Sequence, residues 1–376
     1  MKKVGIITMH RIINYGSALQ AYATLKAISM LGYQAELIDY IFPNQKETIP
    51  FSTNLKNFIL KFFIHLFHGN KKKKFNIFYK KFYNCSKEFH SAEELRNINM
   101  KYDILLTGSD QVWNPMHTKD DLSFLLSFNT NNTPQISYAS SFSKSTLPAE
   151  HKKSYAECLK RYKHISVREK SGINIVKELI GKEPFCACDP TLLLSKKEWE
   201  DLASQGKQMV KGEYILLYIL TYAYNPYPEI LNIIEYVKKQ ANLPVVILDG
   251  SLKNNKISGA KNIKSAGPLE FLRLIKDAAF VVTTSFHGTA FSLNFEKPFF
   301  SVLSDKTKED TRMLDLLDAV GAKERALVYN TPIIDTTFNM DYSIVTPKVE
   351  AIRKESQNYL NMILKDCSDN SDNSDN

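Results

Sequence analysis

The stretch FVVTTSFHGTAFSLNFEKPFFSVL, residues 280–303, contains the clearest fold signal in the chain. Its first five residues are apolar or β-branched, which is typical of a buried strand, and a helical segment follows the turn at residues 285–290. A second apolar run begins directly after Pro298 and predicts another strand. Two buried strands joined by a helix are the repeating unit of a parallel sheet. This stretch therefore predicts an α/β fold.

Similar short runs, each followed by a helix-like segment, occur in two series along the 376 residues. The first series comprises Val4 to Thr8, Ala35 to Asp39, Asp103 to Thr107, Gln135 to Tyr138 and Ile165 to Val167. The second comprises Tyr214 to Leu220, Val245 to Leu248, Phe280 to Thr284 and Phe299 to Leu303. A chain of this length exceeds one comfortable hydrophobic core. We therefore predict two α/β lobes in series, each with a parallel sheet covered by helices on both faces.

The polar stretch from Ser195 to Gly212 separates the two series and marks the expected boundary between the lobes. The predicted parts are an N-terminal lobe, a C-terminal lobe, a C-terminal helix and a disordered tail, over residues 1–200, 210–345, 346–366 and 367–376. A helical pattern with a proline near its start indicates the helix, which could pack back on the first lobe. The tail is a polar SDN repeat with nothing apolar to bury.

The composition, with 44% hydrophobic and 24% charged residues, is that of an ordinary globular protein. No apolar run is long enough to span a bilayer, which excludes an integral membrane protein. The N-terminus MKKVGIITMH lacks a signal-peptide core and cleavage site, so we expect a cytoplasmic protein. Five cysteines are too few and odd in number for a disulfide framework. Cys186 and Cys188 lack a second pair at a zinc-like spacing, so we expect structural thiols and no metal.

Most of the net charge of +9 comes from one segment, residues 54–84, which contains lysines but no acidic residue. Its eight lysines are Lys56, Lys61, Lys71, Lys72, Lys73, Lys74, Lys80 and Lys81. We favour a solvated helical insertion that packs on the body through its phenylalanines. The alternative is a basic amphipathic helix on an anionic membrane surface, with Ile59, Phe62, Phe63, Leu66 and Phe67 on its apolar face. Nucleic acid is not an expected partner, because no recognisable binding module accompanies the lysines.

Ligands of open parallel sheets bind beyond the carboxyl ends of the strands, so the residues after each strand are candidates for a site. After the first strand, Asn14 and Gly16 lead into a helix whose free N–H groups attract anions. The alternative is an ordinary capped helix start. His10, also just after this strand, is a second candidate acid or base.

After the third strand of the first series, Asp110, Trp113 and Asn114 lie in one turn. An acid, an amide and a tryptophan suit recognition of a hydroxyl-rich ring, or a general base acting on a hydroxyl. The alternative is an aspartate that caps a helix and a tryptophan that fills the core. Arg168 follows the strand at Ile165 and could bind a carboxylate or phosphate with two parallel hydrogen bonds, unless Glu169 pairs with it at the surface.

The turn after the strand at residues 280–284 carries Ser285, His287 and Gly288. A lone histidine is usually a core residue, but His287 lies where a strand turns into a helix and where a polar side chain points toward a ligand. The helix N–H groups beside Gly288 would attract an anion. This turn is the most specific functional signal in the sequence.

Four segments, NYGSALQ, GSDQVWNP, SVREKSG and SFHGTAFSLNFEKPF, occur in this order over about residues 3 to 320. With them the chain resembles the polysaccharide pyruvyl transferases. The resemblance implies two Rossmann-like lobes that face each other across a cleft, as in GT-B glycosyltransferases. It implies transfer of a pyruvyl group from phosphoenolpyruvate to a sugar hydroxyl pair, as a ketal, in cell-surface polysaccharides such as capsule or exopolysaccharide. Phosphoenolpyruvate is the donor substrate, and no cofactor is expected.

The resemblance also implies roles for single residues. His287 lies at the phosphoenolpyruvate site, where we expect it to be the acid, Arg168 binds the donor, and Asp110 matches the family's acidic residue and could take a proton from the sugar. One departure concerns the histidine motif, which resembles Arg-Leu-His in well-studied members, whereas this chain has Ser285 before Phe286. The donor therefore loses one expected cation, for which Arg312 is a candidate replacement.

The implied acceptor is a sugar or a lipid-linked oligosaccharide at the cytoplasmic membrane face. Such an acceptor would give the basic segment a purpose, as a peripheral attachment to the inner face of the membrane. Two other functions stay open. One is a GT-B-like glycosyltransferase that uses a nucleotide sugar, because the fold does not separate the two donors. The other is a non-catalytic carbohydrate-binding relative, which the departure at Ser285 allows.

Overall fold

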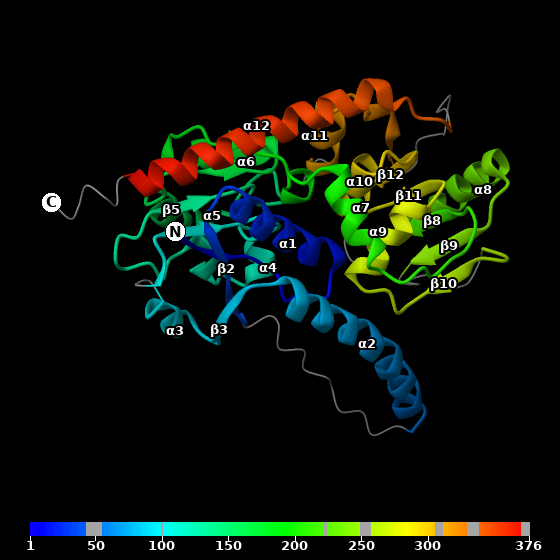
Figure 1. Cartoon of the computed structure of the whole chain (residues 1–376), viewed down its shortest axis with the longest axis horizontal. Helices are drawn as coiled ribbons and strands as arrows, with labels where there is room; N and C mark the ends of the chain where they lie inside the picture. Colours follow the sequence, from blue (N-terminus) through cyan, green and yellow to red (C-terminus); the bar gives the residue numbers. More distant parts are fainter. Residues whose placement is uncertain are drawn as a thin grey trace.

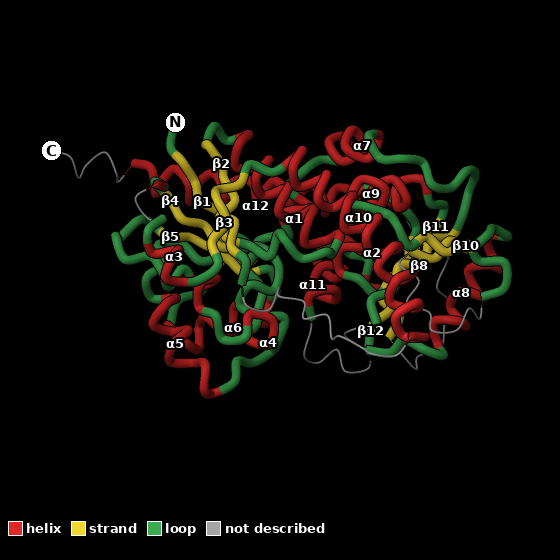
Figure 2. The backbone as a smooth tube through the Cα atoms, turned by 90° about the horizontal axis from the view of Figure 1, so that it is seen from below, coloured by secondary structure: helices red, strands yellow, loops and turns green. Residues whose placement is uncertain are grey.

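The computed structural model describes residues 1–42, 55–98, 101–221, 224–248, 257–304, 311–328 and 338–369. For residues 55–68 it describes the backbone, and side chains are described from Gly69 onward. Two parallel sheets lie toward opposite ends of the long axis of the molecule (Figure 1). Seen from below, helices surround both sheets and fill the space between them (Figure 2). The predicted α/β class with two parallel-sheet lobes is therefore confirmed.

The first sheet has five parallel strands in the order β3-β2-β1-β4-β5. Their bounds are β1 Lys3–Ile7, β2 Gln34–Tyr40, β3 Cys85–Phe89, β4 Ile104–Thr107 and β5 Gln135–Ser137. From β1 the chain adds β2 and then β3, which forms one edge of the sheet, and then returns to place β4 on the other side of β1. The order therefore reverses between β1 and β4, and this switch point is where open α/β sheets bind ligands.

The second sheet has six parallel strands in the order β10-β9-β8-β11-β12-β13. Their bounds are β8 Ile215–Tyr218, β9 Val245–Leu248, β10 Lys261–Ile263, β11 Phe280–Thr283, β12 Phe299–Leu303 and β13 Ala326–Val328. Its switch point lies between β8 and β11, and His287 follows β11. A separate parallel pair, β6 Ser166–Val167 with β7 Phe185–Cys186, extends the first lobe.

Twelve helices connect and cover the strands of the described chain. Their bounds are α1 Tyr15–Met30, α2 Leu55–Phe82, α3 Ala92–Arg96, α4 Pro115–Thr118, α5 Ala149–Leu159, α6 Lys170–Ile180, α7 Lys196–Ser204, α8 Glu229–Ala241, α9 Pro268–Asp277, α10 Phe286–Asn294, α11 Arg312–Ala319 and α12 Tyr342–Asp369. The expected lobe boundary at residue 200 falls inside α7. This helix packs on the second lobe, because its buried Trp199 meets Phe291 of α10 with 4.9 Å between ring centroids.

An apolar core joins the two lobes. Tyr15, at the start of α1, stacks on Phe271 of α9 with ring centroids 4.6 Å apart, and its hydroxyl donates to the carbonyl of Ala266. Phe75 and Phe78 of α2 are fully buried in the same cluster. Truncation of a buried phenylalanine typically costs about 3–5 kcal/mol, so these contacts hold the lobes firmly together.

The basic segment forms α2, one helix of 28 residues. Its C-terminal half packs on the body through Phe75 and Phe78, whose rings contact Tyr15 and Tyr22 of α1, as the favoured interpretation predicts. Lys71 lies over the ring of Tyr15 at 4.4 Å, and Lys74 pairs with Glu270 at 2.9 Å. The side chains of the expected apolar face, Ile59 to Phe67, lie outside the described residues.

The C-terminal helix α12 spans both lobes along one side of the molecule (Figure 1). Val345 and Val349 belong to the core of the second lobe, whereas Leu360 and Ile363 belong to that of the first. The helix is longer than the predicted 346–366 at both ends, because apolar residues such as the fully buried Cys367 continue its packed face. The expected disordered tail is therefore wrong for residues 367–369, and residues 370–376 lie outside the described chain.

Candidate active site

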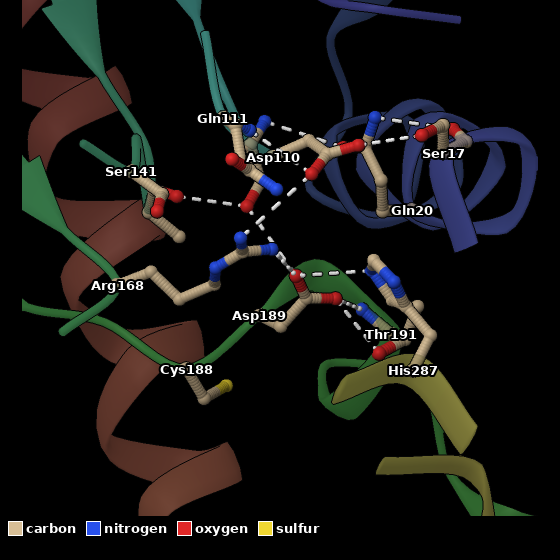
Figure 3. A network of polar contacts seen from close by, with 12 residues as sticks. Ser17, Gln20, Asp110, Gln111, Ser141, Arg168, Cys188, Asp189, Thr191 and His287 are labelled. Carbon is tan, nitrogen blue, oxygen red and sulfur yellow. Dashed lines mark hydrogen bonds and ion pairs between the residues drawn. The ribbon is translucent and has the colours of Figure 1, made fainter. Parts of the chain in front are cut away.

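Polar side chains from five chain segments meet where the two switch points face each other (Figure 3). The segments are the start of α1 after β1, residues 109–111 after β4, residues 168–169 after β6, residues 189–191 after β7, and residues 285–288 after β11. The meeting point brings together Asp110, Arg168 and His287, the three residues to which the sequence assigned the central chemistry.

Asp110 sits in a left-handed backbone conformation, with φ of 69°, which aspartate tolerates better than most residues. Its Oδ2 accepts from Ser17 Oγ at 2.5 Å, and Oδ1 accepts from the backbone N–H of Gln111 at 2.9 Å. Oδ1 also lies 3.7 Å from Nη2 of Arg168. Burial alone would raise the pKa of Asp110, but Arg168, His287 and Ser17 together lower it below the usual range. Asp110 is therefore a buried carboxylate that stays ionised at neutral pH.

Arg168 leaves β6 and is buried, with a side chain that is 1% exposed. Its Nη1 donates to Asp189 Oδ2 at 2.6 Å, whereas Nε and Nη2 have no hydrogen-bond partner among the described residues. The expected alternative, a surface pair with Glu169, is wrong. Glu169 is also buried and instead accepts at Oε1 from the backbone N–H groups of Phe142 and Ser143, and burial raises its pKa.

Asp189 is the site residue that sequence reasoning missed. Its Oδ1 accepts from the N–H and hydroxyl of Thr191 at 3.0 and 2.8 Å, while Oδ2 accepts from Arg168 and, at 3.4 Å, from Ser109. Burial alone would raise the pKa of Asp189, but His287, Arg168 and Thr191 hold this pKa far below its usual range. A sequence feature that could have pointed to Asp189 is the Asp-Pro-Thr turn after β7. Because β7 has only two residues, almost no apolar run precedes this turn.

His287 lies in the first turn of α10, with Nε2 3.6 Å from Asp189 Oδ2. Its ring also packs against α1, because a Cβ added to Gly16 would stand 1.9 Å from Nδ1. Glycine is therefore required at position 16 for this contact. Ser285 caps α10 and accepts from the N–H of Gly288 at 3.3 Å. That N–H group is therefore already engaged within the turn.

The departure from the expected Arg-Leu-His motif has a visible consequence around Phe286. Its ring lies 4.7 Å from the guanidinium carbon of Arg168 and 5.9 Å from that of Arg312. Arg312, the first residue of α11, also acts electrostatically on Asp110. The structure thus brings Arg312 to the same site, near the same aromatic ring as Arg168, and such a ring attracts cations.

The other candidate residues make contacts of their own. Asn14 caps α1, Asn114 caps α4, and Trp113 is fully buried with its indole N–H donated to the carbonyl of Phe124. His10 Nε2 lies 3.0 Å from Asp39, one strand away from the switch point. These contacts match the structural alternatives for Asn14 and Trp113, and the binding roles of all four residues stay predictions.

Among the described residues, His10, Asp39 and Cys85 bring three potential metal-ligand atoms within 4.8 Å of one another. The carboxylate of Asp39 already accepts from Arg11, whose Nε lies 2.5 Å from Oδ1. Burial raises the pKa of the Cys85 thiol to about 12, so it is protonated at neutral pH. The arrangement is that of a buried ion pair beside a thiol.

No helix in the described part of the chain combines the length and the apolar character that crossing a bilayer requires.

Comparison with solved structures shows the fold. UDP-GlcNAc 2-epimerase of Methanocaldococcus jannaschii is 14% identical, covers 95% of this chain and 94% of that chain, and has a TM-score of 0.51. The UDP-N-acetylglucosamine 2-epimerase of Rickettsia bellii is 9% identical, with 98% and 97% coverage and a TM-score of 0.52. The UDP-GlcNAc 2-epimerase of Neisseria meningitidis is 11% identical, with 95% and 94% coverage and a TM-score of 0.52. These similarities confirm the GT-B-like arrangement of two Rossmann-like lobes.

The curated proteins include no significant match to the chain. The sequence family described as polysaccharide pyruvyl transferase, in contrast, matches residues 14–306, which is most of the chain and includes Asp110, Arg168, Asp189 and His287. The chain therefore belongs to the polysaccharide pyruvyl transferase family and is a transferase.

Proposed function

We propose that this enzyme takes phosphoenolpyruvate as its donor and forms a pyruvyl ketal on two hydroxyl groups of a sugar acceptor. The guanidinium of Arg168 carries the proposal, because Nε and Nη2 are buried and no group in the described part of the chain hydrogen-bonds to them. A buried donor left unpaired costs about 1–3 kcal/mol, and more when it is charged. These two nitrogens form one edge of the guanidinium and match the two oxygens of a carboxylate. The carboxylate of the donor would satisfy both.

The chemistry needs one acid, one base and cations for a carboxylate and a phosphate. His287 donates a proton to the methylene carbon of the donor, which leaves a cationic carbon at C2. The first sugar hydroxyl bonds to C2, the C2–O bond to phosphate breaks, and phosphate leaves with the electron pair. The second hydroxyl then bonds to C2 and closes the ketal. The two hydroxyl groups release two protons. One makes up for the proton that His287 gave to the new methyl group, and the other leaves with phosphate.

Asp110 is the base in this scheme. Its low pKa keeps it ionised, and a hydroxyl becomes acidic enough to lose its proton to such a carboxylate as it bonds to the cationic carbon. Arg312 takes the place of the cation lost at Ser285 and, with Arg168, balances the negative groups of the donor. Asn14, Gly16, Trp113, Asn114 and the turn at Gly288 remain proposed contacts of donor or acceptor.

Thermal unfolding in the presence of candidate donors tests this proposal. Phosphoenolpyruvate should raise the melting temperature, because saturation at about 100 times Kd adds about 2.7 kcal/mol of stability. Nucleotide sugars, pyruvate and inorganic phosphate are the parallel ligands. A shift with nucleotide sugars alone would overturn the donor and favour a glycosyltransferase. A shift with phosphoenolpyruvate but no phosphate release with any acceptor would favour a non-catalytic relative.

We further propose that the acceptor is carried on a lipid and that α2 holds the enzyme at an anionic membrane surface. Lys72, Lys73 and Lys80 are exposed, unlike Lys71, which lies over the ring of Tyr15 in α1, and Lys74, which pairs with Glu270 of the second lobe. In Figure 1 the N-terminal part of α2 projects away from the body. The helix therefore presents cations outward, with no acidic residue between positions 54 and 84 to offset them.

Vesicle sedimentation tests this attachment. Replacing Lys72, Lys73 and Lys80 with glutamine should weaken binding to anionic vesicles on the order of 100-fold, since each cation near such a surface contributes about 1 kcal/mol. The control replaces three exposed lysines elsewhere, Lys207, Lys211 and Lys239. Equal binding by the two triple variants would contradict an attachment through α2.

A further inference from the structure

Asp189 lies between side chains of the two lobes, Arg168 and His287, and meets both through one carboxylate oxygen. Its Oδ2 accepts from Arg168 Nη1 at 2.6 Å, a group of the first lobe, and lies 3.6 Å from Nε2 of His287, a group of the second. Its Oδ1 is occupied by Thr191. Figure 3 shows the carboxylate between the guanidinium and the imidazole.

The segment that carries Asp189 is fixed by both lobes and by α12. The N–H of Cys188 donates to Ser356, and Arg353 donates to the carbonyl of Leu192 at 2.6 Å. The carbonyl of Thr191 accepts from the side chains of Trp199 and Asn294 at 2.8 and 2.9 Å. A carboxylate on a backbone held in this way has little freedom to move, which is the condition for orienting its neighbours.

Arg168 lies between two carboxylates, and its distances to them are unequal. Nη1 is in hydrogen-bond contact with Asp189, whereas the nearest atom pair to Asp110 is 3.7 Å apart. A guanidinium that paired fully with Asp110 would engage Nη2, the nitrogen that lies nearest to that carboxylate, and would neutralise the proposed base. Asp189 is therefore placed to prevent that pairing.

We propose that Asp189 is a positioning residue, which holds Arg168 by Nη1 so that Nε and Nη2 face the donor and Asp110 stays available to the acceptor. This inference rests on the proposed function. Asp189 itself touches neither substrate. When His287 is protonated, the same oxygen is its counter-ion, so one carboxylate aligns the donor-binding group of one lobe with the acid of the other.

A mutant cycle measured on phosphoenolpyruvate turnover tests the proposal. Asp189→Asn, which keeps the shape and removes the charge, should raise KM for phosphoenolpyruvate on the order of 10- to 100-fold and lower kcat as well. If Asp189 acts through Arg168, the double variant Asp189→Asn with Arg168→Lys should be no worse in KM than Arg168→Lys alone.

The chain offers a matched control in Asp39, a buried aspartate that also lies between an arginine and a histidine, Arg11 and His10. Asp39→Asn should lower the melting temperature and leave KM for phosphoenolpyruvate unchanged. If Asp189→Asn behaves like Asp39→Asn, Asp189 has a structural role only and the inference is overturned. If the KM increases of the two single variants multiply in the double variant, the inference is overturned as well. Absence of any phosphoenolpyruvate binding to the wild-type enzyme would instead contradict the proposed function.

Discussion

His287→Gln is expected to lower kcat with phosphoenolpyruvate by about two to four orders of magnitude, the range that a positioned general acid or base contributes. Glutamine retains hydrogen-bonding groups and much of the volume against Gly16, but it does not donate a proton to carbon. KM should change far less than kcat, because Arg168 and Arg312 remain to bind the donor. Phosphate release at saturating donor and acceptor is the measurement.

His164→Gln is the control for this experiment. His164 also meets a carboxylate, Asp366, at 2.7 Å, but this pair ties α12 to the first lobe. The control should retain wild-type kcat. If both histidine variants turn over equally, His287 is not the acid, and the proton must reach the methylene carbon from another group.

The interior strands were predictable because each is buried on both faces and therefore reads as a continuous apolar run. Val245 to Leu248 and Phe299 to Leu303 have the predicted bounds. The strands that were missed are β3, β10, β13 and β7. The first three lie at the edges of the two large sheets, where each strand is only partly buried, and β7 lies in the two-stranded pair. In β3 only Phe89 is buried, so the sequence CSKEF lacks an apolar signal.

Asp110, Arg168 and His287 could be found from the sequence because each follows a detectable strand, and parallel strands deliver their carboxyl ends to one edge. Asp189 could not: β7 is as short as β6, but β6 lies in a run with the β-branched Ile165 and Val167, whereas the residues of β7, Phe185 and Cys186, are not β-branched. The contact of Gly16 with His287 could not be predicted either, since it depends on how the two lobes pack together. Periodicity within one lobe contains no information on that packing.

Arg168→Met is expected to have the largest effect on stability, because it leaves the buried carboxylates of Asp110 and Asp189 without their guanidinium. Removing one partner of a buried ion pair typically costs about 3–5 kcal/mol. Arg168→Lys keeps the charge but loses the two-nitrogen edge, so it should retain more stability than Arg168→Met. Both variants should bind the donor more weakly, seen as a smaller melting-temperature shift with phosphoenolpyruvate.

The pH dependence of Arg168→Met gives the sharper check, with denaturant unfolding as the measurement. In the wild type the folded-state pKa values of Asp110 and Asp189 are lowered, so their stabilisation is present above the unfolded pKa of about 3.9 and is lost as pH falls through the lower folded values. Without Arg168 both carboxyls should protonate more readily in the folded state, which relieves the buried charge at low pH. The stability difference between wild type and variant should therefore be largest near pH 7 and should narrow as pH falls toward 4. A difference that stays constant over this range would mean that Arg168 stabilises the fold by packing alone, and that its charge does not hold the two carboxylates.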